Sequence, residues 1–171
     1  SLCMHHRRKH QLPKYLTREE LQRLLAQAKG QDRFIVLFLY NSGARVSELV
    51  NFQVEDIEFE NKTINIFRGK GAKDRVVNVS QEFLDELKSF IKERKSGVLF
   101  ESSWKKPYSQ RAIQKKIKRM AINAKIPYIT RISPHTLRHT HAVHALQSGV
   151  NIVSIKKHLG HESIKTTMVY T

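Results

Sequence analysis

The chain has 171 residues, with 31 Lys and Arg against 15 Asp and Glu, which gives a formal net charge of +16 and an isoelectric point near 10.2. This length suits one domain with an adequate core, and the charge favours a polyanionic partner, nucleic acid first, over a membrane surface. The single cysteine, Cys3, excludes an intramolecular disulfide, and without a long apolar run or a signal peptide the sequence predicts a cytoplasmic protein.

Residues 1–12 precede the first pattern that is typical of regular structure. They are rich in His, Arg and Lys and show no hydrophobic periodicity, so we interpret them as a basic linker or arm. Such an arm predicts a further DNA-binding domain upstream, in which case the chain is a fragment of a longer protein. Residues 13–171 are predicted to form one folded domain.

Three helices are predicted at the start of this domain. Thr17 and Glu20 form a capping box, which predicts a helix that begins there and ends at Gly30. A more apolar helix is predicted over residues 34–40, and a short one over residues 45–51.

A small sheet is predicted next, because the hydrophobic pattern changes to period two. Residues 54–59, 63–67 and 75–79 are predicted to be three antiparallel strands, and residues 69–74 are predicted to be the turn between the second and the third.

The rest of the chain is predicted to be helical apart from an extended piece at residues 98–100. Ser80, Ser109 and Ser133 are predicted helix caps, the last followed by a first-turn proline. The predicted helices cover residues 81–94, 110–124, 134–149 and 151–159, with a last one from Ser163 that carries Tyr170. The fold class is therefore α+β, mainly helical, with a small three-stranded antiparallel sheet.

Five motifs stand in order along the chain: GARVSEL at 43–49, GKG at 69–71, SPHTLRH at 133–139, LGH at 159–161 and a tyrosine at 170. Their order resembles that of the tyrosine recombinase (phage integrase) family, in particular its Xer-like members, from about Leu12 to the last residue. The resemblance implies that residues 13–171 have that family's catalytic-domain fold. It implies the catalytic set Arg45, Lys70, His135, Arg138, His161 and Tyr170.

The resemblance implies a role for each of these residues. Tyr170 is the nucleophile, activated by nearby positive charge or a base. Arg45 and Arg138 clamp the phosphoryl oxygens, for which a planar and permanently charged guanidinium is suited. His135 accepts or relays the phenolic proton, and His161 hydrogen-bonds a phosphoryl oxygen.

Two further residues support the set. Glu48 lies three residues after Arg45, and we expect it to orient Arg45 or His135 rather than to take part in the chemistry. Lys70 and Lys73 share one turn, and either could protonate the leaving oxygen. The GKG pattern of the family selects Lys70 and leaves Lys73 to contact backbone phosphate.

The helix predicted over residues 110–124 is the expected DNA-contacting element. Its apolar face leaves Arg111, Lys115, Lys116, Lys118 and Arg119 outside. Ser109, Gln110, Arg111 and Gln114 are best placed for base edges if its first half enters the major groove. The residues assigned to DNA binding are Lys73, Arg111, Gln114, Lys115, Lys118, Arg119 and His139.

A metal site is the alternative that the histidines raise. His135 and His139 have the i, i+4 spacing of a zinc pair, and His141 and His144 follow. No glutamate lies between the pair and Cys3 is far away in sequence, so we expect no metal. The resemblance likewise implies no cofactor and no small-molecule substrate.

These observations predict a site-specific DNA recombinase of the Xer or integrase type that acts on double-stranded DNA in a prokaryotic cytoplasm, at the nucleoid. The resemblance implies a 3′-phosphotyrosyl intermediate, independence from ATP and metal, and four protomers on two DNA sites. This chain alone is expected to be monomeric. The alternatives are a type IB topoisomerase and a non-catalytic DNA-binding module on the same fold.

Overall fold

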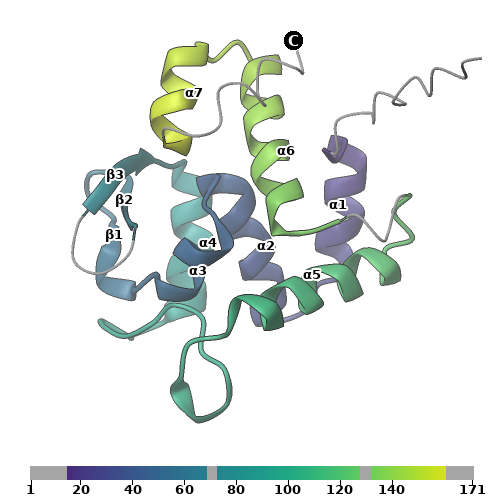
Figure 1. Cartoon of the computed structure of the whole chain (residues 1–171). Helices are drawn as coiled ribbons and strands as arrows, with labels where there is room; N and C mark the ends of the chain where they lie inside the picture. Colours follow the sequence, from purple (N-terminus) through teal and green to yellow (C-terminus); the bar gives the residue numbers. More distant parts are fainter. Residues whose placement is uncertain (1–14, 69–72, 128–131, 161–171) are drawn as a thin grey trace, which may run out of the picture.

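Helix α2 (Gln31–Ser42) is central in the structure, a computed structural model that describes residues 15–68, 73–127 and 132–160 (Figure 1). It packs against α1 (Arg18–Gln27), α3 (Val46–Asn51), α4 (Gln81–Ile91) and α6 (Pro134–Gln147). Phe38 of α2 is fully buried, and its ring lies 4.7 Å from that of Phe52 and 5.8 Å from that of Phe100. None of the described helices is long and apolar enough to span a membrane.

Helix α1 begins as the capping box predicts but ends earlier. The Oγ1 of Thr17 accepts from the Glu20 amide at 3.1 Å, and the Glu20 carboxylate accepts from the Thr17 amide at 3.0 Å. The helix stops at Gln27, so the prediction that it ends at Gly30 was wrong: Gly30 caps the start of α2.

The sheet has three antiparallel strands in the order β1 (Ile57–Glu58), β2 (Thr63–Phe67) and β3 (Lys73–Asn78). The predicted first strand over 54–59 was wrong in its first half, where η1 (Val54–Asp56) forms instead. The Asp56 carboxylate accepts from the Gln53 amide at 3.0 Å, and this local bond replaces strand pairing. The third strand begins at Lys73, two residues before its predicted start.

The second half of the chain holds α4, a protruding loop with η2 (Ser103–Lys105), α5 (Gln110–Asn123), α6 and α7 (Ile152–Leu159). Helix α4 ends at Ile91 rather than at the predicted residue 94, because Lys92 has a φ of 54°. Helix α5 contacts α1, α3 and α6 along the lower side of Figure 1. The prediction of a mainly helical domain with a three-stranded antiparallel sheet is confirmed. The predicted arm (1–12) and the predicted last helix, from Ser163, lie outside the described residues.

Helix α7 is attached to the fold through its C-terminal end. It packs on α6 and β3 (Figure 1), where Ala142, Ile155 and Leu159 form a small apolar cluster separate from the main core. The turn after α2 meets this end at Gly43, whose φ is 67°. A Cβ on Gly43 would lie 2.6 Å from Leu159 Cδ2 and 2.7 Å from His141 Cδ2, so only glycine allows this close approach.

Replacing Gly43 with alanine should therefore be costly. Left-handed backbone costs ~1–2 kcal/mol in a residue with a Cβ, and overpacking adds ~1–3 kcal/mol, so Gly43→Ala should lower the free energy of unfolding by about 2–5 kcal/mol. Gly149→Ala is the matched control, because its φ is 87° but its Cβ would meet nothing within 4 Å. Urea denaturation measures both variants. Equal losses in the two would show that packing against α7 adds nothing.

Candidate active site

Three elements bring several of the predicted site residues together: the turn from α2 to α3, the first half of α6 and the start of β3. Arg45 ends the first element and Glu48 follows it in the first turn of α3, while His135, Arg138 and His139 come from the second. Lys70, His161 and Tyr170 lie outside the described residues.

Arg138 lies inside the protein, with 2% of its surface exposed. Its Nη1 donates to the Gly43 carbonyl at 2.6 Å, and its Nη2 donates to the Leu159 carbonyl. The last carbonyls of a helix have no partner within the helix and carry partial negative charge, so a guanidinium is a suitable cap for α7. Burial also excludes the alternative of an ordinary surface cation. In this structure Arg138 joins the α2–α3 turn to the end of α7.

Arg75 is a residue of this site that the sequence analysis missed. Its Nε donates to the His158 carbonyl at 2.7 Å, and its two Nη atoms hold the Glu48 carboxylate at 2.7 and 2.9 Å. The Asp74 carboxylate accepts a further bond from Nη1 at 2.8 Å. The signal that could have found it is strand alternation, which puts Arg75 on the inward face with Val77.

Glu48 is the acidic centre of this group. Burial on its own would raise the pKa of Glu48, but hydrogen bonds from Arg75 and from the Arg45 backbone outweigh it and hold that pKa below its usual value. The carboxylate is therefore ionised at neutral pH. Its described hydrogen bonds and ion pairs go to Arg45 and Arg75 rather than to His135.

Arg45 lies at the edge of the group, and 21% of its side chain is exposed. The Arg45 amide donates to Glu48 Oε1 at 2.8 Å, and its Nη1 lies 3.6 Å from Glu48 Oε2. A Cβ on Gly160 would lie 3.6 Å from Arg45 Nη1 and 3.7 Å from Arg75 Nη1. Both guanidinium groups thus border Gly160, the residue that precedes His161 in the sequence.

His135 and His139 lie one turn apart on α6, with ring centroids 4.0 Å apart in an edge-to-face contact. Burial, followed by the charges of Arg138 and Arg45, lowers the pKa of His135. The pKa of His139 is lowered to about 4, mainly by burial and further by the charges of His135 and Arg138. His135 is therefore neutral near pH 7 and able to accept a proton.

The remaining described histidines of α6 and α7 hold the fold together. His144 Nε2 donates to the Leu16 carbonyl at 2.9 Å, which leaves Nδ1 to accept from the Tyr40 hydroxyl at 2.7 Å. His141 donates to the Tyr40 carbonyl at 2.6 Å and stacks on His158, with ring centroids 4.8 Å apart. Within residues 15–68, 73–127 and 132–160, no three His, Cys, Asp or Glu side chains are grouped to hold a metal.

The outer face of α5 is basic, as predicted, with one correction. Its apolar side chains Ile113, Ile117, Met120 and Ala121 are buried. Lys116 was predicted to lie outside, but it forms an ion pair with Asp32 at 2.9 Å and lies 5.3 Å from the centre of the Tyr108 ring. The other predicted DNA-contacting side chains of this helix are exposed: Arg111, Gln114, Lys115, Lys118 and Arg119. Lys73, at the start of β3, is also exposed.

The family model described as the phage integrase family matches residues 14–171. The tyrosine recombinase XerA of Pyrococcus furiosus is 40% identical over 168 residues, which cover 94% of this chain and 57% of XerA. Tyrosine recombinase XerD of Staphylococcus saprophyticus is 37% identical over 156 residues, which cover 86% of this chain and 52% of XerD. The chain thus spans somewhat more than half the length of these relatives.

Solved structures share the fold. A XerA recombinase crystal structure superimposes with a TM-score of 0.81 at 33% identity, covering 93% of this chain and 60% of that one. The structure of XerH bound to a palindromic difH substrate superimposes with a TM-score of 0.76 at 25% identity. The match covers 94% of this chain and 50% of XerH. The catalytic domain of bacteriophage HP1 integrase superimposes with a TM-score of 0.70 at 29% identity. The match covers 91% of this chain and 85% of that domain.

The buried histidines predict how stability depends on pH. The pKa of His141 is lowered to about 3, and those of His139 and His158 to about 4, from 6.5. The unfolded chain therefore binds more protons than the folded chain below pH 6.5. The stability from neutral histidines is complete above pH 6.5 and is lost as pH falls below it, on the order of 1 kcal/mol for each histidine by about pH 5.5.

Urea denaturation between pH 7 and pH 5.5 measures this loss while most carboxylates stay ionised. His158→Gln should reduce the slope of stability against pH, because it removes one of the three groups. A free energy of unfolding that stays constant or rises over this interval would contradict the assignment.

Proposed function

This chain belongs to the phage integrase family, and we propose that it is the catalytic domain of a site-specific tyrosine recombinase that breaks and rejoins DNA. The observation that carries the proposal is that Arg45 and Arg138 both lie close enough to His135 to lower its pKa. Glu48, which Arg75 holds, contacts Arg45. Phosphoryl transfer leaves little covalent work to the protein, so positioning and charge dominate. A cluster of guanidinium groups supplies both.

The proposed first step is attack of the Tyr170 oxygen on a DNA phosphorus. The P–O5′ bond breaks, a 3′-phosphotyrosyl bond forms, and the 5′-oxygen leaves as a hydroxyl. Arg45 and Arg138 would stabilise the charge on the non-bridging oxygens, with His161 as a further donor.

Two proton transfers complete the proposed step. The phenolic proton goes to His135, whose lowered pKa keeps it neutral and receptive. Lys70 donates a proton to the leaving 5′-oxygen, and Lys73 of the same segment contacts backbone phosphate. Attack by a 5′-hydroxyl of a partner duplex reverses the step and frees Tyr170. The bond energy is conserved, so ATP and metal are not required.

Double-stranded DNA is the proposed substrate, contacted by the exposed cations of α5. Support comes from the XerH structures, which hold difH DNA before and after cleavage. The similarity to relatives that are named recombinases does not favour the alternatives of a topoisomerase or a non-catalytic DNA-binding module. The proposal extends to the assembly and the place of action: four copies would act together on two DNA sites, in the cytoplasm of a prokaryote.

Covalent trapping tests the proposed nucleophile. The protein is incubated with a pool of nicked suicide duplexes, and denaturing electrophoresis detects protein joined to DNA. Tyr170→Phe removes one oxygen and leaves every cation in place, so it should abolish the adduct and keep DNA affinity within about twofold, or ~0.5 kcal/mol.

Tyr128→Phe is the matched control and should retain the adduct. An adduct that persists in Tyr170→Phe and disappears in Tyr128→Phe would move the nucleophile. DNA binding without any adduct in the unmodified protein would favour the non-catalytic alternative.

A further inference from the structure

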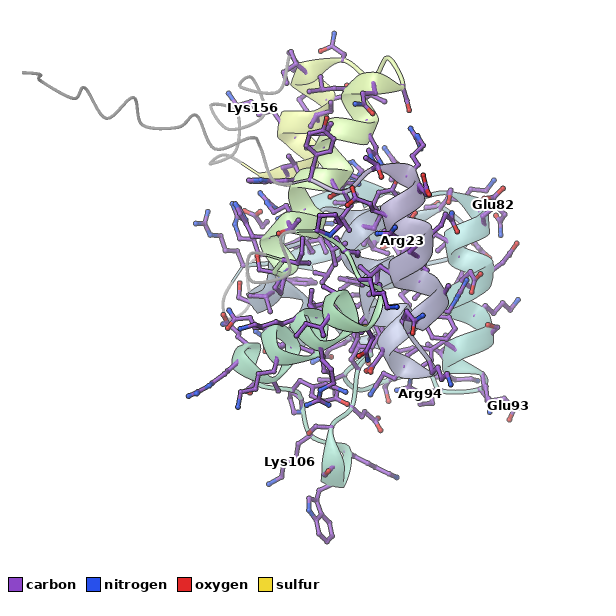
Figure 2. All side chains as sticks on the ribbon, turned by 90° about the vertical axis from the view of Figure 1, so that its right-hand side faces the viewer. Arg23, Glu82, Glu93, Arg94, Lys106 and Lys156 are labelled. Carbon is purple, nitrogen blue, oxygen red and sulfur yellow. The ribbon has the colours of Figure 1, made fainter. Side chains whose placement is uncertain are left out.

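The loop between α4 and α5 carries an exposed tryptophan. Trp104 is 89% exposed, whereas the other exposed large apolar side chains among the described residues lie between 44% and 54%. Tryptophan is highly buried on average in folded proteins, and it is enriched at interfaces between binding partners. Figure 2 shows the neighbouring Lys106 at the end of the loop that projects furthest from the helices. Among residues 15–68, 73–127 and 132–160, little packs against the indole, since 89% of Trp104 is exposed.

The backbone at the tip is strained. Trp104 has a φ of 65° and Lys105 has a φ of 56°, so two consecutive residues with a Cβ adopt the left-handed region. This conformation is unfavourable for both residue types and is uncommon outside glycine, asparagine and aspartate. Strain of this kind is concentrated at binding and catalytic sites. A glycine or asparagine at 104 would fit the backbone better, so the tryptophan is not there for the turn.

The base of the loop is fixed, which distinguishes it from a loosely held connection. The Lys106 carbonyl accepts from the Ser102 amide at 2.7 Å and from its hydroxyl at 2.8 Å. Gln31 of α2 exchanges hydrogen bonds with the Glu101 backbone at 2.9 and 3.1 Å and donates to the Tyr108 hydroxyl at 2.7 Å. The loop therefore presents Trp104 from a rigid support directly before α5.

The charge around the tip fits one kind of partner. Lys105 and Lys106 are exposed beside Trp104. Between Ser102 and His161 the sequence has twelve Lys and Arg and no Asp or Glu, so the loop continues the positive charge of α5. An apolar protein pocket would accept the indole alone, whereas a DNA backbone accepts both the indole and the two cations.

We propose that Trp104, Lys105 and Lys106 form a sequence-independent anchor on duplex DNA beside the groove that α5 contacts. The indole lies against a deoxyribose with its N–H towards a phosphate, and the two lysines contact neighbouring phosphates. This rests on the proposed function, because it takes DNA to lie along α5. The anchor adds affinity and a fixed spacing from α5, and it reads no base.

Trp104 is the single tryptophan of the chain, so its fluorescence reports on this loop alone. The protein is titrated with a mixed-sequence duplex while indole emission and quenching by acrylamide are recorded. DNA should change the emission and protect the indole from acrylamide. The same titration with labelled DNA gives affinity by anisotropy.

Three variants separate the parts of the anchor. Trp104→Asn should weaken DNA binding at least about fivefold, or ~1 kcal/mol for the apolar area that the indole buries against the sugar, without changing the salt dependence. Lys105→Ala with Lys106→Ala should reduce the slope of log K against log salt by about 2, close to one for each phosphate contact. Val153→Ala, an exposed apolar site on α7, should change neither quantity.

Thermal unfolding excludes a merely structural explanation. Asparagine tolerates the left-handed backbone, so Trp104→Asn should unfold at the same or a higher temperature while it binds DNA more weakly. A lower unfolding temperature would mean that the tryptophan stabilises the fold, and the anchor would be wrong.

The outcomes also separate this inference from the proposed function. If DNA binds and Arg111→Ala weakens it, but Trp104 fluorescence and the Trp104→Asn affinity stay unchanged, the anchor alone is overturned. If the duplex does not bind at all, the proposed function and the anchor are both overturned. Concentration-dependent protection of Trp104 without DNA would assign the loop to contact between protein copies instead.

Discussion

Two buried guanidinium groups hold the C-terminal end of α7, and the described part of the site depends on them. Arg138 donates to the Leu159 carbonyl and Arg75 to the His158 carbonyl. These carbonyls have no partner within the helix, and they carry the negative end of its dipole. The apolar cluster beneath α7 is small, with Ala142, Ile155 and Leu159 as its buried members. Polar contacts therefore contribute much of what attaches this helix.

The same two arginines connect α7 to the residues proposed for catalysis. Arg138 reaches the Gly43 carbonyl in the turn that leads to Arg45, and Arg75 holds the carboxylate that also contacts Arg45. Removal of one partner from a buried ion pair costs about 3–5 kcal/mol, so Glu48 and Arg75 are strongly coupled. The position of Arg45 thus depends on α3, on β3 and on the end of α7 together. This arrangement places Gly160 next to the guanidinium groups of Arg45 and Arg75.

The sequence predicted elements whose signals are local, and it missed contacts made between distant segments. The Thr17 and Glu20 capping box and the apolar face of α5 depend on residues a few positions apart, and both were correct. The first half of the strand predicted over 54–59 forms η1 instead, because the Asp56 carboxylate accepts a competing local bond from the Gln53 amide. Arg75 and Lys116 were misjudged because their partners, Glu48 and Asp32, lie 27 and 84 residues away. The site residues themselves came from family resemblance, since periodicity gives no reason to bury Arg138.

Hydrogen exchange of the α7 amides tests most directly whether the buried arginines attach this helix. Arg75→Lys keeps the charge but removes the planar fork, and Arg33→Lys makes the same change at a more exposed pair with Glu86. Arg75→Lys should speed exchange in Ile155–Leu159 at least about tenfold, or ~1.4 kcal/mol of opening free energy, while α2 keeps its protection. Arg33→Lys should leave α7 unchanged. Unaltered protection of α7 in Arg75→Lys, or an equal loss in α7 and α2, would contradict the account.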